Sequence, residues 1–133
     1  MVPLCLIEIK YALNPDIQNV HEQLSQYYQE IQRETESIVT ETETVFKQKL
    51  ELSLFKLPEE RLEAMRTLTF SKDIKNFQFI ILLVDYNPHS SHFDLNKLAV
   101  LPFASQIRVT RTGFALWESN LKCPERLQRC SMT

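Results

Sequence analysis

The chain has 133 residues, of which 44% are hydrophobic and 24% are charged, and this is the composition of a globular protein that can form a packed core. It excludes a wholly disordered chain, and the length corresponds to a single domain. The net charge of -2 excludes a chain that binds nucleic acid through its overall charge, so contacts with phosphates would come from local basic patches.

Charge is distributed unevenly along the chain. Residues 30–63 hold nine acidic side chains against five basic ones, whereas residues 105–133 hold five basic against two acidic ones. The basic stretch fits two interpretations equally, a patch that meets phosphates or an ordinary solvated surface. The acidic stretch fits helices that pair with a partner helix.

Cysteine and glycine usage narrows the class of protein further. The three cysteines, at positions 5, 123 and 130, form no even disulfide framework and cannot supply a four-cysteine metal site, so we expect reduced thiols and a cytoplasmic protein. The chain has one glycine, Gly113, which excludes glycine-rich phosphate-binding loops. Its longest apolar run, at 77–84, is too short to cross a bilayer, and we expect no membrane partner.

The chain begins with a predicted strand over residues 3–12, where apolar side chains dominate. Asn14-Pro15-Asp16 then has the composition of a helix start, because asparagine caps, proline suits the first turn and an early acid favours the positive end of the helix. Apolar residues at helical spacing follow as far as Ile31. These patterns predict a strand followed directly by an amphipathic helix.

The later elements are predicted from the same two periodicities. A helix is predicted to begin at Leu57-Pro58, with Leu62, Met65 and Leu68 facing the core. The strand at 77–86 is continuously apolar, as expected for a strand buried on both faces. In order, we expect a helix at 34–54, the helix from 57, the strand at 77–86, a turn at 87–91, a short helix at 94–100, and strands at 106–111 and 114–118 joined by a hairpin at 112–113.

This order of elements predicts an α/β fold in which helices flank a mixed sheet. We assign residues 1–121 to this domain and residues 122–133 to a polar, frayed tail.

Glu8 and Lys10 are the sharpest local feature of the sequence. They lie two residues apart on the first predicted strand, so they project from the same face. Two charges on one face of an apolar strand are costly unless they are paired or used. A carboxylate can hold Mg²⁺, and a neighbouring ammonium can stabilise growing charge on a phosphate. The alternative is an edge strand with one solvated face, because so short a motif recurs by chance.

The strand around Glu8-Ile9-Lys10 resembles the Glu-x-Lys strand of the PD-(D/E)XK nuclease superfamily, which includes restriction endonucleases and RecB-type exonucleases. A helix follows at once, as in that family. Its Gln23 and Tyr27 are similar to the Gln-x-x-x-Tyr motif of the RecB-like branch, and they share a helix face, although a core tyrosine with a solvated glutamine would give the same pattern. The resemblance covers residues 3–33, and residues 77–86 by pattern.

The resemblance implies a restriction-endonuclease-like fold and a Mg²⁺- or Mn²⁺-dependent nuclease that acts on DNA. Glu8 would be a metal ligand, with the backbone carbonyl of Ile9 as a further ligand, and Lys10 would be the catalytic lysine. Gln23 and Tyr27 would support the site or the DNA.

This sequence departs from the family at one position. The family places an aspartate on the strand before the Glu-x-Lys strand, and no residue here fills that position. We therefore expect an N-terminally incomplete domain, either a truncated or split product that needs an upstream acidic segment, or an inactive remnant. An exposed sheet edge of this kind predicts a homo-oligomer.

A second cluster of polar residues follows the strand at 77–86. It contains Asp85, His89, His92 and Asp94, whose side chains suit zinc or manganese. The favoured interpretation is a polar turn in which Asp94 caps a helix, although Asp85 could still face the same pocket as Glu8. Phe114 and Trp117, near Arg108 and Arg111, could stack on nucleic acid, but such aromatic residues more often belong to the core.

Two functions of different classes therefore stand. The first is a metal-dependent DNA endonuclease or exonuclease domain from restriction, defence or repair. The second is a non-catalytic protein-interaction module that uses the acidic helices at 30–63.

Overall fold

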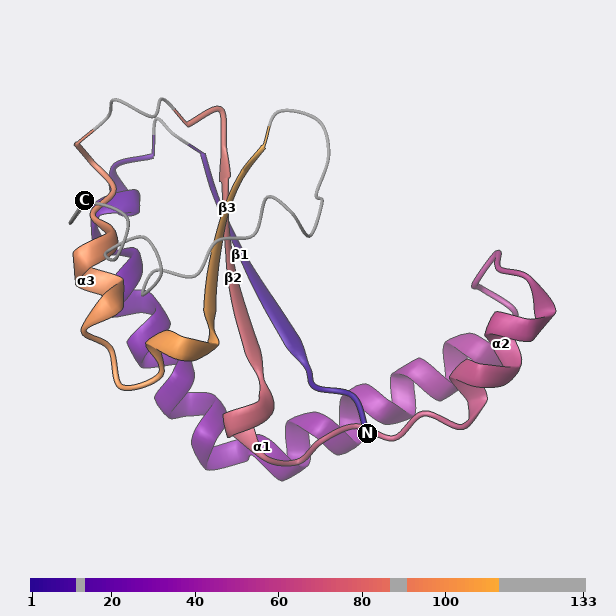
Figure 1. Ribbon diagram of the computed structural model, residues 1–133. Helices are drawn as coiled ribbons and strands as arrows, with labels where there is room; N and C mark the ends of the chain where they lie inside the picture. The colour runs from indigo at the N-terminus through magenta and orange to yellow at the C-terminus, as the bar shows by residue number, and fades with distance from the viewer. Residues whose placement is uncertain (12–13, 87–90, 113–133) are drawn as a thin grey trace, which may run out of the picture.

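Three parallel strands form the centre of the part of the molecule that the structure describes (Figure 1). The computed structural model describes residues 1–11, 14–86 and 91–112. Within these residues β1 (Cys5–Tyr11), β2 (Gln78–Val84) and β3 (Ile107–Thr112) lie side by side in the order β1-β2-β3. The predicted α/β class is confirmed, and the described strands all run in one direction rather than as a mixed sheet. The predicted strand at 114–118 and the tail at 122–133 lie outside the described residues.

β2 is the central strand because its apolar run can be buried on both faces. Phe79, Ile81 and Leu83 point to one face and are at most 1% exposed, and Ile80 on the opposite face is also buried. A buried parallel strand is expected to be apolar throughout, so the prediction for this segment is confirmed.

Helix α1 (Val20–Glu51) carries the chain back from the end of β1 to the start of β2. It is preceded by the 3-10 turn η1 (Pro15–Asn19), whose cap is Asn14: the Asn14 Oδ1 atom accepts the Asp16 N–H at 2.9 Å. The predicted helix start is therefore confirmed. The buried residues of the predicted apolar stripe join the core, and they are Ile17, Val20, Leu24 and Ile31.

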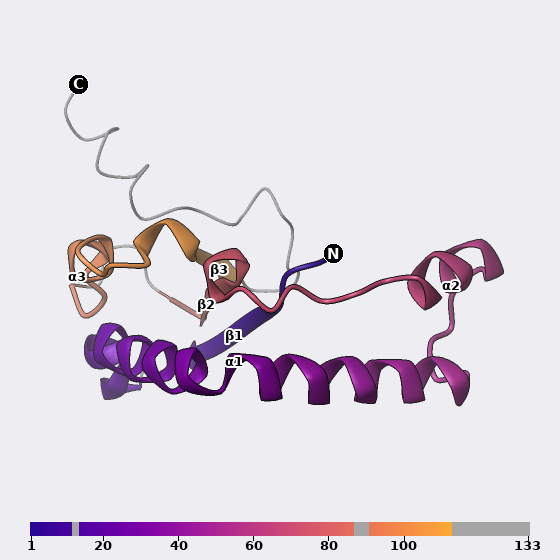
Figure 2. The same cartoon turned by 90° about the horizontal axis from the view of Figure 1, so that it is seen from below.

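The helix is kinked at Glu34, which has non-helical dihedral angles of φ -115° and ψ 16°. Beside the kink, the Thr35 hydroxyl donates to the carbonyl oxygen of Ile31 at 2.7 Å. The sequence predicted a new helix from Glu34, and the kink lies at that boundary. The half of α1 after the kink extends away from the sheet, and α2 (Glu59–Arg66) lies beside its far end (Figures 1 and 2). We call residues 35–66 the arm.

The arm has little core of its own. Leu62, Met65 and Leu68 were expected to face inward, but they are only half-buried, and α2 contains no buried residue. The arm is held to the body by Val39, which is completely buried in the main core, and by Phe46, whose ring lies 5.3 Å from that of Phe70 between centroids.

The short elements η2 (Ile74–Asn76), α3 (Leu95–Ala99) and η3 (Ala104–Gln106) complete the described chain. Phe103, just before η3, stacks on Tyr28 of α1 at 4.1 Å between ring centroids, so α3 and the first half of α1 lie on the same face of the sheet (Figure 2). The first half of α1 and the segment around α3 therefore cover the same face of the sheet. No described helix has the length and the apolar character needed to cross a membrane.

Replacing Ile81 should test the assignment of the core. Ile81 is completely buried, so we expect Ile81→Ala to lower the free energy of unfolding by about 2–5 kcal/mol in urea denaturation. Leu52→Ala is the matched control, because Leu52 is 69% exposed and its loss should change stability by less than about 0.5 kcal/mol. Equal effects of the two substitutions would contradict the described core.

Glu43 should make the attachment of the arm sensitive to acid. Hydrogen bonds from the Lys47 ammonium and from the Phe70 N–H lower the pKa of the Glu43 carboxyl from its ordinary value. A carboxyl with a lowered folded-state pKa stabilises the fold above its unfolded pKa, and this stabilisation is lost as the pH falls through the folded value. We expect Glu43→Gln to lower the thermal midpoint at pH 7, and the difference from the parent chain to shrink at pH 3. A difference that stays constant with pH would exclude this role.

Candidate functional site

Glu8 and Lys10 lie together on the face of β1 that the helices cover. In the sheet they are aligned with Ile81 and Leu83 of β2, whose side chains belong to the core. The Lys10 Nζ and Glu8 Oε1 atoms are 2.9 Å apart, and the two side chains are 8% and 24% exposed. The pair is therefore an ion pair at the border of the core, with Lys10 as the more buried partner.

The alternative of an edge strand with a solvated charged face is wrong for β1. This strand is at the edge of the described sheet, but its open face carries Ile7, Ile9 and Tyr11, which are 48%, 53% and 62% exposed. The charged residues are covered and the apolar ones are open, which is the reverse of what that interpretation predicts. Both charged side chains therefore lie on the face of β1 that the following helix covers, and of the two only Glu8 lines the cavity between β1 and α1.

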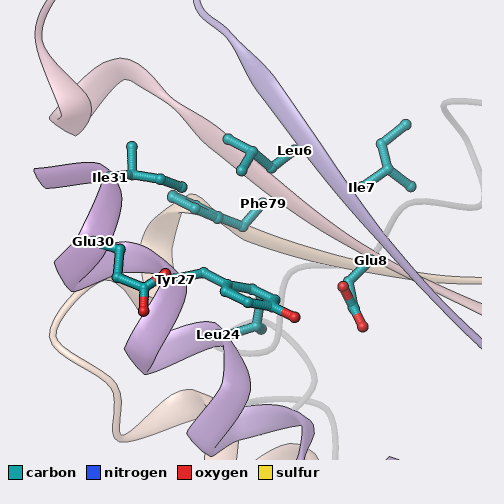
Figure 3. Close-up of a pocket in the computed structure, with 8 residues that line it drawn as sticks. All are labelled: Leu6, Ile7, Glu8, Leu24, Tyr27, Glu30, Ile31 and Phe79. Carbon is teal, nitrogen blue, oxygen red and sulfur yellow. The ribbon is translucent and has the colours of Figure 1, made fainter. Parts of the chain in front are cut away.

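A cavity of about 300 Å³ lies between β1 and α1 beside the ion pair (Figure 3). Most of its wall is apolar, and the polar groups are Glu8, Glu30 and the phenol of Tyr27. Figure 3 shows the Tyr27 hydroxyl directed toward Glu8, whereas Glu30 lies on the other side of the Tyr27 ring. The lining residues are Leu6, Ile7, Glu8, Leu24, Tyr27, Glu30, Ile31 and Phe79.

Gln23 and Tyr27 are placed differently with respect to this cavity. Tyr27 lines it, but Gln23 does not. Gln23 lies one helical turn before Tyr27, and because α1 runs against β1, this turn is nearer the end of β1 that carries Lys10. The Gln23 Oε1 atom is buried and has no hydrogen-bond partner among the described residues. The predicted alternative of a solvated glutamine is wrong for this atom.

Glu30 was not identified from the sequence as a site residue. It lies three residues after Tyr27, so the two side chains share one face of the helix. This spacing was the available signal, but it is common on amphipathic helices and does not by itself distinguish a site from a solvated face. The Glu30 carboxylate accepts a hydrogen bond from the Gln26 amide at 3.0 Å.

The described residues do not by themselves fit a magnesium ion. No group of three or more histidine, cysteine, aspartate or glutamate side chains in the described ranges is placed to hold a metal. The Glu8 carboxylate could contribute to a metal site, but its Oε1 atom forms the ion pair with the Lys10 ammonium. The Ile9 side chain lies on the opposite face, so Ile9 could contribute only its backbone carbonyl. A complete site would need a second carboxylate.

The polar residues after β2 do not gather into a metal site in the described chain. Asp94 caps α3 by accepting the Asn96 N–H at 2.9 Å, which confirms the helix-cap interpretation. His92 Nδ1 lies 2.9 Å from the Gln18 amide nitrogen, and His89 lies outside the described residues. Asp85 is exposed in a left-handed conformation with φ 55° and does not line the cavity beside Glu8, so the suggestion that it shares that pocket is wrong.

Two arginines of β3 are engaged within the chain. The Arg108 guanidinium donates to the carbonyl oxygens of Ser105 and Ile107 at 2.7 and 2.8 Å. The Arg111 guanidinium lies over the Tyr86 ring, 5.0 Å from its centroid. Phe114 and Trp117, with the remaining basic residues of the 105–133 stretch, lie outside the described residues, so the expected nucleic-acid patch stays a prediction.

Comparisons of the chain with protein-family models, with curated proteins and with solved structures found no match.

A double-mutant cycle should measure how strongly Glu8 and Lys10 depend on each other. Glu8→Gln leaves a buried ammonium without its partner, and we expect it to cost about 1–3 kcal/mol of stability, less than a fully buried pair because Glu8 is partly exposed. Glu8→Gln combined with Lys10→Met should cost less than the sum of the two single changes. Urea denaturation of the four proteins gives the coupling, and additivity within about 0.5 kcal/mol would show that the pair is not coupled.

Proposed function

We propose that this chain carries the Glu-x-Lys half of a metal-dependent DNA nuclease site of PD-(D/E)XK type, from a restriction, defence or repair system. The observation that supports the proposal most is the Glu8–Lys10 ion pair on the covered face of β1, beside a cavity that α1 closes with Tyr27. An acid and a lysine at the border of a core are costly to retain, and a catalytic site is one reason to retain them.

The proposed roles follow from where the side chains lie. Lys10 would stabilise the charge that grows on a phosphate during hydrolysis, because its ammonium is held in place by Glu8 and shielded from bulk water. Tyr27 would donate its hydroxyl to an oxygen of the phosphate or of Glu8. Gln23, whose acceptor oxygen has no hydrogen-bond partner among the described residues, would receive a hydrogen bond from the nucleic acid or from an ordered water.

Glu8 would be one ligand of Mg²⁺ or Mn²⁺, and a carboxylate from outside the described residues of this chain would be a second ligand. Carboxylate oxygens are the ligands that these ions prefer. The proposal includes a restriction-endonuclease-like fold, which the unit β1-α1-β2, with its two strands parallel and adjacent, supports. We also propose a cytoplasmic location, where thiols remain reduced.

The proposal predicts that DNA cleavage depends on Lys10. When a partner segment supplies the second carboxylate, the chain should cleave double-stranded DNA in the presence of Mg²⁺ or Mn²⁺. Lys10→Ala should lower the cleavage rate by about 100-fold or more, because it removes a preorganised charge at the reacting phosphate. The measurement is a gel assay of plasmid cleavage, with EDTA as the metal-free control.

Lys72→Ala is the matched control, because Lys72 forms an exposed ion pair with Glu36 away from the cavity. It should cleave at the parent rate, and circular dichroism should show that both variants are folded. Metal-dependent cleavage that survives unchanged in folded Lys10→Ala would overturn the proposal.

A non-catalytic interaction module is the second candidate, and the arm favours it. The turn after α1 exposes Leu52, Leu54 and Leu57, which are 69%, 61% and 38% exposed, at the far end of an acidic helix. Exposed apolar residues on a projecting element are typical of surfaces that bind another protein. Binding of Mn²⁺ at Glu8 together with DNA degradation by the purified chain would exclude this candidate as the main function.

A further inference from the structure

The free edge of β1 could pair with a neighbouring strand, which would contact the exposed side chains of β1 from the side. Within the described residues β1 is hydrogen-bonded on one side only, to β2. Its open face exposes Ile7, Ile9 and Tyr11. Parallel sheets are normally covered on both faces, and an exposed strand edge is a template for pairing with another chain.

The charges on β1 make this edge complementary to itself. In an antiparallel pair of two β1 strands centred on Ile9, Glu8 of each copy lies opposite Lys10 of the other. A register two residues earlier would place Glu8 opposite Glu8, and a register two residues later would place Lys10 opposite Lys10. Opposite charges across a strand pair stabilise it, and like charges destabilise it.

The alternation of charged and apolar faces along β1 also favours the register centred on Ile9. A shift by a single residue would place the exposed Ile9 of one copy on the face that carries Glu8 of the other, and would turn one copy's helices to the opposite side. In the register centred on Ile9, apolar residues meet on the open face, where Ile9 lies opposite Ile9 and Ile7 opposite Tyr11. Helix α1 lies over both β1 and β2, so the two α1 helices would be about 10 Å apart, a normal spacing for packed helices.

We propose that two copies of this chain pair antiparallel through β1 in the register centred on Ile9, and that the second copy contributes its Glu8 to the site. Across such a pair the two Glu8 residues are diagonal neighbours on one face, at about 7–8 Å, which is within reach of long side chains. The pair thus adds a second carboxylate beside the Glu8 that each chain supplies. This contribution rests on the proposed nuclease function, whereas the pairing rests on the edge alone.

Disulfide trapping tests the pairing and its register. In a chain with Cys5, Cys123 and Cys130 changed to serine, Ile9→Cys should form a covalent dimer on mild oxidation, because opposite residues of an antiparallel pair are about 4.5–5.5 Å apart at Cα, within disulfide range. Ile7→Cys is the matched control, since Ile7 is similarly exposed at 48% but would be about 13 Å from its counterpart. We expect at least a tenfold excess of dimer for Ile9→Cys on non-reducing gels.

Light scattering on the unmodified chain should give twice the monomer mass of 15.7 kDa at micromolar concentration. A monomer would overturn the pairing, and so would equal trapping of Ile7→Cys and Ile9→Cys. A monomer whose β1 amides are protected from hydrogen exchange would show that the edge is covered by the chain itself, which also overturns it. A dimer that does not cleave DNA would leave the pairing in place and remove the contribution of the second copy's Glu8 to the site, whereas a monomer that cleaves DNA would overturn the pairing and leave the nuclease function in place.

Discussion

The ion pair between Glu8 and Lys10 is the interaction on which the candidate site and the proposed pairing of β1 depend. Moving an ammonium and a carboxylate to the edge of a core costs several kcal/mol per ion, and good pairing recovers much of that cost. The 2.9 Å contact supplies the pairing, and the partial exposure of Glu8 keeps the cost lower than for a fully buried pair. Apolar residues at both positions would pack the same space at lower cost. The pair is therefore more easily explained by chemistry than by stability.

Placing both charges on the covered face has a consequence for the other face. Side chains alternate along a strand, so turning Glu8 and Lys10 toward α1 turns Ile7, Ile9 and Tyr11 outward. The described residues therefore leave the apolar face of β1 exposed, while its charged side chains lie on the face that α1 covers. The same alternation links the two proposals, since the residues that form the ion pair also determine which register a neighbouring strand would adopt.

Much of the fold follows from local patterns in the sequence. The uninterrupted apolar run of β2 and the Asn14 cap are strong signals, and both lie where they were predicted. The kink near Glu34 coincides with a predicted helix boundary.

Other features depend on contacts that a pattern does not encode. Alternation predicts that Glu8 and Lys10 share a face, but which face is covered is decided by the position of α1. Leu62 and Met65 have helical spacing and yet remain half-buried, because α2 packs against an arm rather than against the sheet. Asp85 follows β2 directly, but its left-handed backbone and exposed side chain place it outside the cavity.

Lysine acetylation followed by mass spectrometry tests the central placement most directly. In the folded chain, Lys10 should react much more slowly than the exposed Lys72, because its ammonium is covered and held by Glu8. In Glu8→Gln the rate at Lys10 should rise while the rate at Lys72 stays the same. Equal rates at Lys10 and Lys72 in the folded parent chain would show that Lys10 faces solvent, which would contradict the site described for this protein.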